Sequence, residues 1–255
     1  MSTDDPTHDP ARHRGSAPSR LSRRGFLIGG AACAGVLAVP PVAVARPRLS
    51  AAATANYTLT VTNDSTQFQD ICLYQKPVDL GVPNALSLAW LTAAARPNHS
   101  VTFTWSLDYS FAWAMTGPLQ PGGHFSAWQR VSADPADPNQ NRIGFDHDNG
   151  SFGFTPAAGP GQAGVLEIDV QDDVPEGTAS VGIGMTDAPV FAAQAEPGTI
   201  LPFTPHPAYW VTAGTFFTGQ VLDVEEITDA APVPFDGTYA MQAVLTPDND
   251  WSVTP

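Results

Sequence analysis

The chain has 255 residues, of which 43% are hydrophobic and 9% aromatic, a composition that supplies a packed core and excludes an intrinsically disordered protein. Its formal net charge of −14 divides unevenly, because residues 1–55 hold seven arginines and three aspartates whereas residues 56–255 hold 22 carboxylates and four basic side chains. The acidic segment repels phosphate backbones and anionic lipid surfaces, which excludes nucleic acid as a partner.

Residues 1–45 have the parts of an export signal. A polar leader without an apolar period, which is typical of disorder, comes first. Arg23 and Arg24 then precede an apolar run over residues 26–45, and this arrangement resembles the twin-arginine translocation motif. A small-x-small site predicts cleavage after Ala45. We therefore expect the twin-arginine translocation machinery as a partner, membrane contact only during export, and a secreted or extracytoplasmic location.

Two alternatives for this segment remain open. An apolar run of about 20 residues is long enough to span a bilayer uncleaved, although Pro40, Pro41 and several glycines disfavour a permanent anchor. Lipidation at Cys33 is the second alternative, which the apolar residues beyond Cys33 disfavour. After cleavage, Cys72 is the single remaining cysteine, so no disulfide can form within the chain, and its apolar neighbours predict a buried side chain rather than a nucleophile.

Residues 46–55 are expected to form a short linker, and residues 56–255 a single all-β domain, an antiparallel β-sandwich resembling a jelly roll. Apolar and polar side chains alternate repeatedly along this segment, and Gly, Pro, Asn and Asp separate the alternating stretches. The predicted strands are 57–62, 69–75, 86–91, 101–113, 125–131, 142–146, 151–154, 164–170, 180–186, 190–194, 208–213, 216–224, 239–246 and 251–254. The longest polar loop between them is 133–141.

The stretch 101–113 has an apolar residue at every odd position. Thirteen residues exceed the usual strand of about five to six, which predicts either a bent strand that crosses between sheets or two strands. The regularity of the odd face favours core packing. The same alternation is also typical of membrane-crossing strands, so a membrane-active or pore-forming protein is the third functional alternative.

Two acidic stretches are candidates for calcium. Asp146 to Gly150 has carboxylates at close spacing, but the residue order of a calcium loop fails there, and Asn149-Gly150 favours a hairpin turn. Asp169, Asp172, Asp173 and Glu176 surround a Pro-Glu-Gly turn and supply oxygen ligands that Ca²⁺ accepts, although a solvated loop explains the same residues. We expect no other cofactor.

Aromatic residues give the strongest indication of function. Tyr209 and Trp210 are adjacent, so a strand points them to opposite faces and one of them is expected at the surface. With His206 in the preceding proline-rich loop they form a candidate ligand site, most simply for a sugar. The sequence contains no Gly-x-Ser-x-Gly motif and no histidines at metal-binding spacing, which favours a non-enzymatic protein that binds an extracellular ligand, such as a glycan. An extracellular hydrolase that uses an unassigned carboxylate pair is the alternative.

Several stretches together resemble one family. They are Tyr57 to Ser65, Cys72 to Gln75, Leu86 to Trp90, Phe103 to Trp113, Val181 to Met185, Pro205 to Pro207 and Gly219 to Val224. In this order they resemble the RhiA-like proteins of rhizosphere bacteria, from about residue 56 to the end of the chain, with the export signal as an addition. The resemblance implies a compact β-rich domain and a quorum-regulated, rhizosphere-associated context, and it transfers no catalytic residues.

Overall fold

The protein is described by a computed structural model that covers residues 55–255. The expected export signal, with Arg23, Arg24 and the cleavage site after Ala45, and nearly all of the expected linker lie outside the described residues. Residues 55–255 belong to one compact unit with 17 strands in four sheets. Within this range there is no helix, and so none with the length and apolarity to cross a membrane. The expected all-β sandwich class is confirmed.

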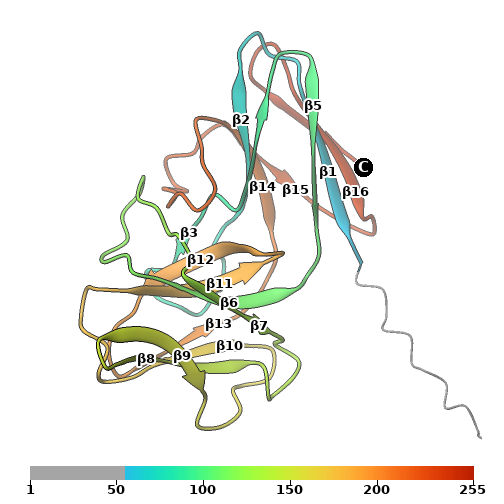
Figure 1. Cartoon of the computed structure of the whole chain (residues 1–255). Helices are drawn as coiled ribbons and strands as arrows, with labels where there is room; N and C mark the ends of the chain where they lie inside the picture. The colour runs from blue at the N-terminus through green and yellow to red at the C-terminus, as the bar shows by residue number, and fades with distance from the viewer. Residues whose placement is uncertain (1–54) are drawn as a thin grey trace, which may run out of the picture. The chain divides into compact units, whose positions relative to one another are not determined.

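Two of the sheets form what we call the first sandwich, whose strands run roughly vertically in Figure 1. One sheet has the order β17-β16-β1-β5 and the other β15-β14-β2-β4. Rings from the two sheets meet between them, as in the contact of Trp105 with Tyr209 at 5.0 Å between centroids. The strands are β1 (Tyr57–Asn63), β5 (His99–Trp105), β16 (Ala240–Leu245), β17 (Trp251–Thr254), β2 (Gln69–Gln75), β4 (Leu91–Ala95), β14 (Tyr209–Gly214) and β15 (Ala230–Val233).

The other two sheets form the second sandwich, whose strands run roughly across the first set in Figure 1. Their orders are β3-β12-β11-β6-β7 and β13-β10-β8-β9, and Trp113 of one sheet contacts Phe145 of the other at 5.6 Å. The strands are β3 (Leu86–Ser87), β6 (Tyr109–Ala114), β7 (Gln129–Ala133), β11 (Ser180–Met185), β12 (Ala188–Gln194), β8 (Arg142–Asp148), β9 (Ser151–Pro156), β10 (Leu166–Val170) and β13 (Thr199–Phe203).

The predicted stretch 101–113 joins the two sandwiches. It forms two strands in different sheets, β5 and β6, and the chain bends sharply between them (Figure 1). The bend is held by Thr186, whose hydroxyl accepts from the backbone N–H of Ser106 at 2.9 Å and donates to the carbonyl of Ser106 at 2.8 Å. Most of the odd-numbered side chains enter the core, whereas Leu107 at the bend is exposed. The predicted division into two strands and the predicted core packing of the odd-numbered face are therefore confirmed.

One apolar core runs through both sandwiches without a break. Its densest part is an aromatic cluster of Tyr57, Trp90, Trp105, Tyr209 and Phe235, in which neighbouring ring centroids are 5.0 to 6.1 Å apart. Trp90 also donates its indole N–H to the carbonyl of Met185 in β11 at 2.8 Å. This hydrogen bond ties the cluster in the first sandwich to a strand of the second.

Loops cover the outer faces of two sheets, and one of them corrects a predicted strand. Residues 216–224 form no strand but a loop with isolated bridges at Gln220 and Val221. Leu222 packs with Cys72 and Tyr74 on the outer face of β2, while Val221 packs on the outer face of the five-stranded sheet. The apolar alternation of this segment therefore reflects contact with two sheets at once rather than membership of either.

Other differences concern prolines and strand direction. Strands β13 and β15 were missed because each contains a proline, Pro202 or Pro232, and both lie at sheet edges, where proline is tolerated. The alanine-rich β4 was also missed, and the strand expected at 125–131 lies at 129–133. Two pairings, β1 with β16 and β8 with β10, are parallel, so the sheets are not purely antiparallel as expected.

Candidate functional site

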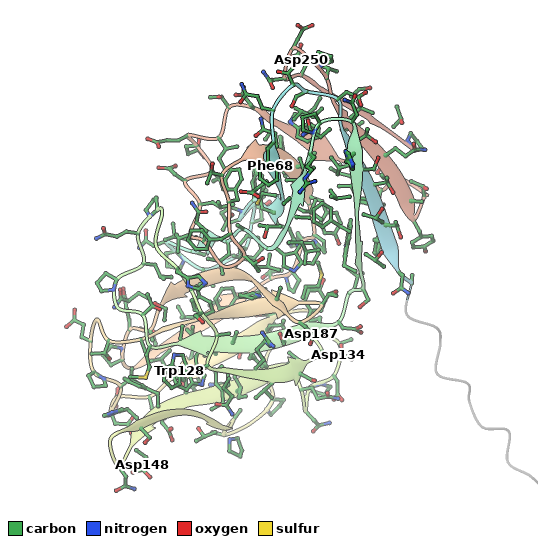
Figure 2. The ribbon with its side chains drawn as sticks, turned by 45° about the horizontal axis from the view of Figure 1, so that its top comes forward. Phe68, Trp128, Asp134, Asp148, Asp187 and Asp250 are labelled. Atoms are coloured by element: carbon green, nitrogen blue, oxygen red, sulfur yellow. The ribbon has the colours of Figure 1, made fainter. Side chains whose placement is uncertain are left out.

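Trp128 is the most exposed large apolar side chain of the described residues, with 70% of its surface accessible. It lies just before β7, beside a hollow of about 360 Å³ that we call the Trp128 groove and that is lined by Ser110, Ala127, Trp128, Gln129, Arg130, Ser132 and Asp187. Figure 2 shows Trp128 and Asp187 over the same sheet of the second sandwich. An exposed ring beside a polar hollow is an arrangement that recognises ligands with both apolar and polar faces.

The exposed ring has a rigid support. One face of Trp128 stacks on Trp113, with centroids 6.2 Å apart and an interplanar angle of 16°. Trp113 is buried and contacts Phe145 and Phe152 of the opposite sheet at 5.6 and 5.9 Å. The indole N–H of Trp113 donates to the side-chain oxygen of Gln129 at 2.9 Å. Trp128 is thus backed by the core and keeps its other face for solvent or ligand.

Polar groups around the ring have unused hydrogen-bonding capacity. The hydroxyl of Ser110 is buried and has no hydrogen-bond partner among the described residues. Arg130 and Asp187 are both exposed and line the same groove, yet neither is part of an ion pair within residues 55–255. A guanidinium offers five donors and a carboxylate several acceptor sites. The groove therefore presents donors and acceptors of both kinds beside an apolar platform.

The residues predicted from the sequence lie elsewhere, Tyr209 and Trp210 on β14 and His206 in the loop before it. Tyr209 and Trp210 do point to opposite faces of β14, as expected: Tyr209 enters the aromatic cluster and Trp210 the outer face. Burial raises the pKa of Tyr209 above the ordinary value for tyrosine. Trp210 is half-buried, and the ammonium of Lys76 sits 3.9 Å from its ring centroid. His206 is exposed in the preceding loop.

A hollow of about 510 Å³, the aromatic cleft, does adjoin two of these residues. It is lined by Tyr57, Leu107, Pro207, Ala208, Tyr209, Trp210, Pro232, Val233, Pro234, Phe235 and Asp236. His206 is not part of its lining. Tyr209 is buried in the core, and Tyr57, Trp210 and Phe235 are half-buried, so this cleft has no aromatic ring as exposed as Trp128.

The four acidic residues proposed for calcium are not brought together. Asp169 accepts from the guanidinium of Arg142 at 2.6 Å, and Asp173 accepts from the backbone N–H of His147 at 3.3 Å. Asp172 and Glu176 are exposed in the turn that follows β10. Within the described part of the chain, no three His, Cys, Asp or Glu side chains are arranged to hold a metal ion.

The acidic hairpin is a turn, as predicted. Asn149 and Gly150 both have positive φ, 49° and 81°, and they connect β8 with β9. Figure 2 shows Asp148 at the tip of this hairpin. Burial raises the pKa of Asp146, and the nearby charges of Asp173 and Asp148 raise it further. The raised pKa of Asp146 thus reflects burial and the proximity of two further negative charges on this hairpin.

Two further features bear on catalysis. Cys72 is buried and free, and burial raises its pKa far above the range in which a thiolate forms, so it is a packing residue. Glu176 and Glu196 both line a hollow of about 420 Å³ beside Asn84 and Gln194. Among the hollows described here, this is the one that two carboxylates line together.

Trp128 was not singled out from the sequence, and the predicted strand 125–131 included it. In the structure β7 begins at Gln129, the residue after Trp128, so Trp128 lies outside the strand. The available signal was the polarity of its surroundings: Ser126, Gln129 and Arg130 flank Trp128, whereas the rings of 101–113 alternate regularly. An aromatic residue outside any apolar period is the pattern to seek in such chains.

Comparisons with known proteins agree with the resemblance noted above. The family model described as RhiA matches residues 54–255, a range that includes both sandwiches. Protein RhiA of Rhizobium leguminosarum bv. viciae is 36% identical over 203 residues, which cover 78% of this chain and 86% of that protein. No solved structure matches significantly.

Proposed function

Because the chain belongs to the RhiA family, we propose that it is an exported member that binds a sugar at the cell exterior without converting it. The Trp128 groove is the binding site in this proposal. The observation that carries it is the 70% exposed Trp128 ring, backed by Trp113 and bordered by unpaired polar groups. Sugars present a face of C–H groups surrounded by hydroxyls. In the Trp128 groove, the Trp128 ring would pack against the C–H face and the polar side chains would bind the hydroxyls.

The chemistry of the groove supports binding rather than turnover. Asp187 is its single carboxylate, whereas glycoside hydrolysis ordinarily needs two on either side of the bond. Arg130 and Asp187 can instead donate to and accept from neighbouring sugar hydroxyls. A neutral ligand suits a domain whose strongly acidic composition repels anions.

The test is thermal unfolding of the protein against a panel of soluble neutral glycans. A ligand that binds only the folded state stabilises it by about 2.7 kcal/mol at a hundredfold excess over Kd. We expect one glycan class to raise the unfolding midpoint, and Trp128→Ala to abolish that rise. Since Trp128 is exposed, the variant itself should stay within about 1 kcal/mol of the parent in stability.

Phe68→Ala is the matched control, because Phe68 is also a large exposed aromatic residue, 59% accessible, but lies outside the groove. It should leave the glycan response unchanged. A response that survives Trp128→Ala and is lost in Trp210→Ala would assign the ligand to the aromatic cleft instead. If no glycan raises the midpoint, the sugar-binding proposal fails.

Export is a separate part of the proposal and has its own experiment. In a bacterial host with twin-arginine translocation, replacing Arg23 and Arg24 with lysines should retain the protein as an intracellular precursor, while the parent is cleaved after Ala45 and exported. Arg20→Lys, outside the arginine pair, is the control. Equal export of the double variant and the parent would contradict twin-arginine export.

A hydrolase is the second candidate, favoured by Glu176 and Glu196 in one hollow. Two carboxylates that flank a cleft are the minimum for acid–base cleavage of a glycoside. Screening with chromogenic glycosides tests it: activity that falls at least a hundredfold in Glu176→Gln and in Glu196→Gln, but not in Glu226→Gln outside the hollow, would establish the enzyme. No activity in the parent would remove this candidate.

A further inference from the structure

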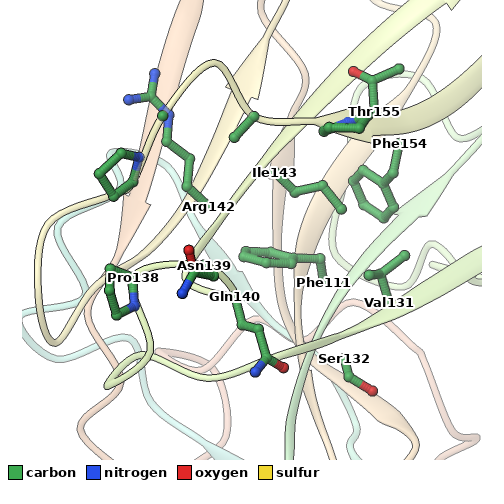
Figure 3. A pocket seen from close by; sticks show the side chains of 14 residues that line it. Phe111, Val131, Ser132, Pro138, Asn139, Gln140, Arg142, Ile143, Phe154 and Thr155 are labelled. Atoms are coloured by element: carbon green, nitrogen blue, oxygen red, sulfur yellow. The ribbon is translucent and has the colours of Figure 1, made fainter.

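A hollow larger than the three described above lies at the open edge of the second sandwich, across β7 from the Trp128 groove. We call it the edge cavity; its volume is about 710 Å³. Strand β7 is the edge of one sheet and β9 the edge of the other, and the cavity opens between them. The residues that line it are Phe111, Val131, Ser132, Pro138, Asn139, Gln140, Arg142, Ile143, Phe154, Thr155, Pro156, Ala157, Gly159 and Pro160 (Figure 3).

The inner wall of the edge cavity is apolar. Phe111 and Ile143 are buried at its base, and Val131 and Phe154 are half-buried beside them (Figure 3). The rings of Phe111 and Phe154 meet edge to face, with centroids 6.4 Å apart. The volume falls in the range of small-molecule sites, about 300 to 1,000 Å³. A ligand with a compact apolar ring system would displace water from the cavity and pack against these side chains.

Two loops that form the mouth are held in place by internal hydrogen bonds. Buried Asn141 donates to the carbonyl of Gln162 at 2.9 Å and accepts from the N–H of Gly161 at 3.0 Å. Asp137 accepts from the side chains of Asn139 and Gln140 at 3.0 and 2.7 Å. The cavity is therefore preformed, so a ligand need not order these loops when it binds.

The charges around the edge cavity select against an ionic ligand. Arg142 is the single charged residue of the lining; its Nη2 donates to Asp169 at 2.6 Å, and its buried Nε lies 3.7 Å from a carboxylate oxygen of Glu167 without a hydrogen-bond partner. An anion would meet these two carboxylates, and a cation would find no carboxylate in the lining itself. Either charge would lose hydration, and the carboxylates of Asp169 and Glu167 already balance the positive charge of Arg142. At the mouth, the amide nitrogens of Asn139 and Gln140 donate to Asp137, and their side-chain carbonyl oxygens remain as acceptors for a neutral ligand.

From this geometry we propose that the edge cavity binds an uncharged aromatic or alicyclic small molecule that carries one or two hydrogen-bonding groups. The ring packs against Phe111, Ile143 and Phe154, and its polar group faces the mouth. This site is distinct from the Trp128 groove and does not depend on sugar binding. The proposal predicts that the protein binds a compact apolar compound between the edge strands β7 and β9.

The probe is N-phenyl-1-naphthylamine, an uncharged two-part ring compound whose fluorescence rises in apolar surroundings. Its matched charged analogue is 8-anilino-1-naphthalenesulfonate, which adds one sulfonate to the same ring system. We expect saturable binding of the neutral probe at one site and at least tenfold weaker binding of the sulfonate. Equal binding of the two probes, or no saturable binding of the neutral one, would overturn the proposal.

Location is tested by filling the cavity from its rim. Ala157→Trp places a large ring at a lining position in a surface loop, and we expect at least a tenfold loss of affinity for the neutral probe. Ala158→Trp, the next residue, is exposed and outside the lining, and should bind as the parent does. Val131→Trp blocks the facing wall and is the second variant should Ala157→Trp not fold. Unchanged probe affinity in a folded blocking variant would overturn the assignment.

Discussion

In the first sandwich, five aromatic rings pack against one another, with Trp90, Trp105 and Tyr209 buried and Tyr57 and Phe235 half-buried, whereas in the second sandwich the ring contacts run outward. There, Phe145 contacts Trp113, and Trp113 supports the exposed Trp128. The Trp128 groove and the edge cavity both flank the edge strand β7 of the second sandwich. The comparison shows two roles for aromatic residues in this protein. Where two sheets cover each other, the rings form the core, whereas at the edge of a sheet a ring remains exposed beside a candidate site.

The largest expected effect is a loss of stability caused by a substitution in the core of the first sandwich. Trp105 is fully buried and its ring contacts Tyr57, Trp90, Tyr209 and Phe235. Trp105→Ala removes all four contacts and leaves a cavity, so we expect a loss of about 3–5 kcal/mol in the free energy of unfolding. Urea denaturation measures it. A loss below about 1 kcal/mol would show that the cluster is not the centre of the core.

The next effect tests the close approach of strands in the five-stranded sheet. A Cβ at Gly182 would overlap the carbonyl oxygen of Phe191 and lie 2.9 Å from the Cα of Ala192. We therefore expect Gly182→Ala to destabilise the protein by about 1–3 kcal/mol. Gly153→Ala in β9 is the control, since its nearest atom would be 4.0 Å away. Similar losses in both variants would exclude steric overlap as the cause.

A smaller effect concerns the partial cover of Trp210. Lys76→Met keeps the aliphatic stem but removes the ammonium over the ring. We expect the free energy of unfolding to fall by about 0.5–1 kcal/mol. Tryptophan fluorescence should also change. Should Lys76→Met gain glycan binding that the parent lacks, the aromatic cleft would become a second open face, and the contrast between the sandwiches would weaken.

The smallest effect is electrostatic and lies on the hairpin of the second sandwich. Because the pKa of Asp146 is raised in the folded state, its ionisation disfavours folding at neutral pH. Asp146→Asn should therefore raise the unfolding midpoint at pH 7. The difference should shrink as the pH falls and vanish below the unfolded pKa of about 3.9, where the parent is protonated in both states. A difference independent of pH would point to packing instead.

Sequence periodicity predicted the fold wherever each segment packs on one neighbour. The alternation of 101–113 identified β5 and β6, and Asn149-Gly150 identified the β8–β9 hairpin. It failed where contacts with several elements compete: 216–224 alternates because it covers two sheets, not because it joins one. It also missed edge strands that contain proline, since an edge tolerates a residue that a central strand does not.

The candidate site was harder to predict than the fold. That Tyr209 and Trp210 diverge follows from strand geometry alone, but which of them is covered depends on Lys76 and on the aromatic cluster, both distant in sequence. The Trp128 groove requires Ser110, Arg130 and Asp187 to meet, and no local pattern connects them. Periodicity specifies the face on which a side chain lies, whereas a site depends on what that face meets.

The parallel pairing of β1 with β16 has a consequence for how the protein is made. The first strand of the domain lies between β16 and β5, so one side of it stays unpaired until the last part of the chain has been synthesised. Such sequence-distant pairing slows folding, because a long loop must close before the contact forms. A nascent chain that lacks β16 therefore exposes an open strand edge, and the first sandwich is completed only once β16 has been synthesised.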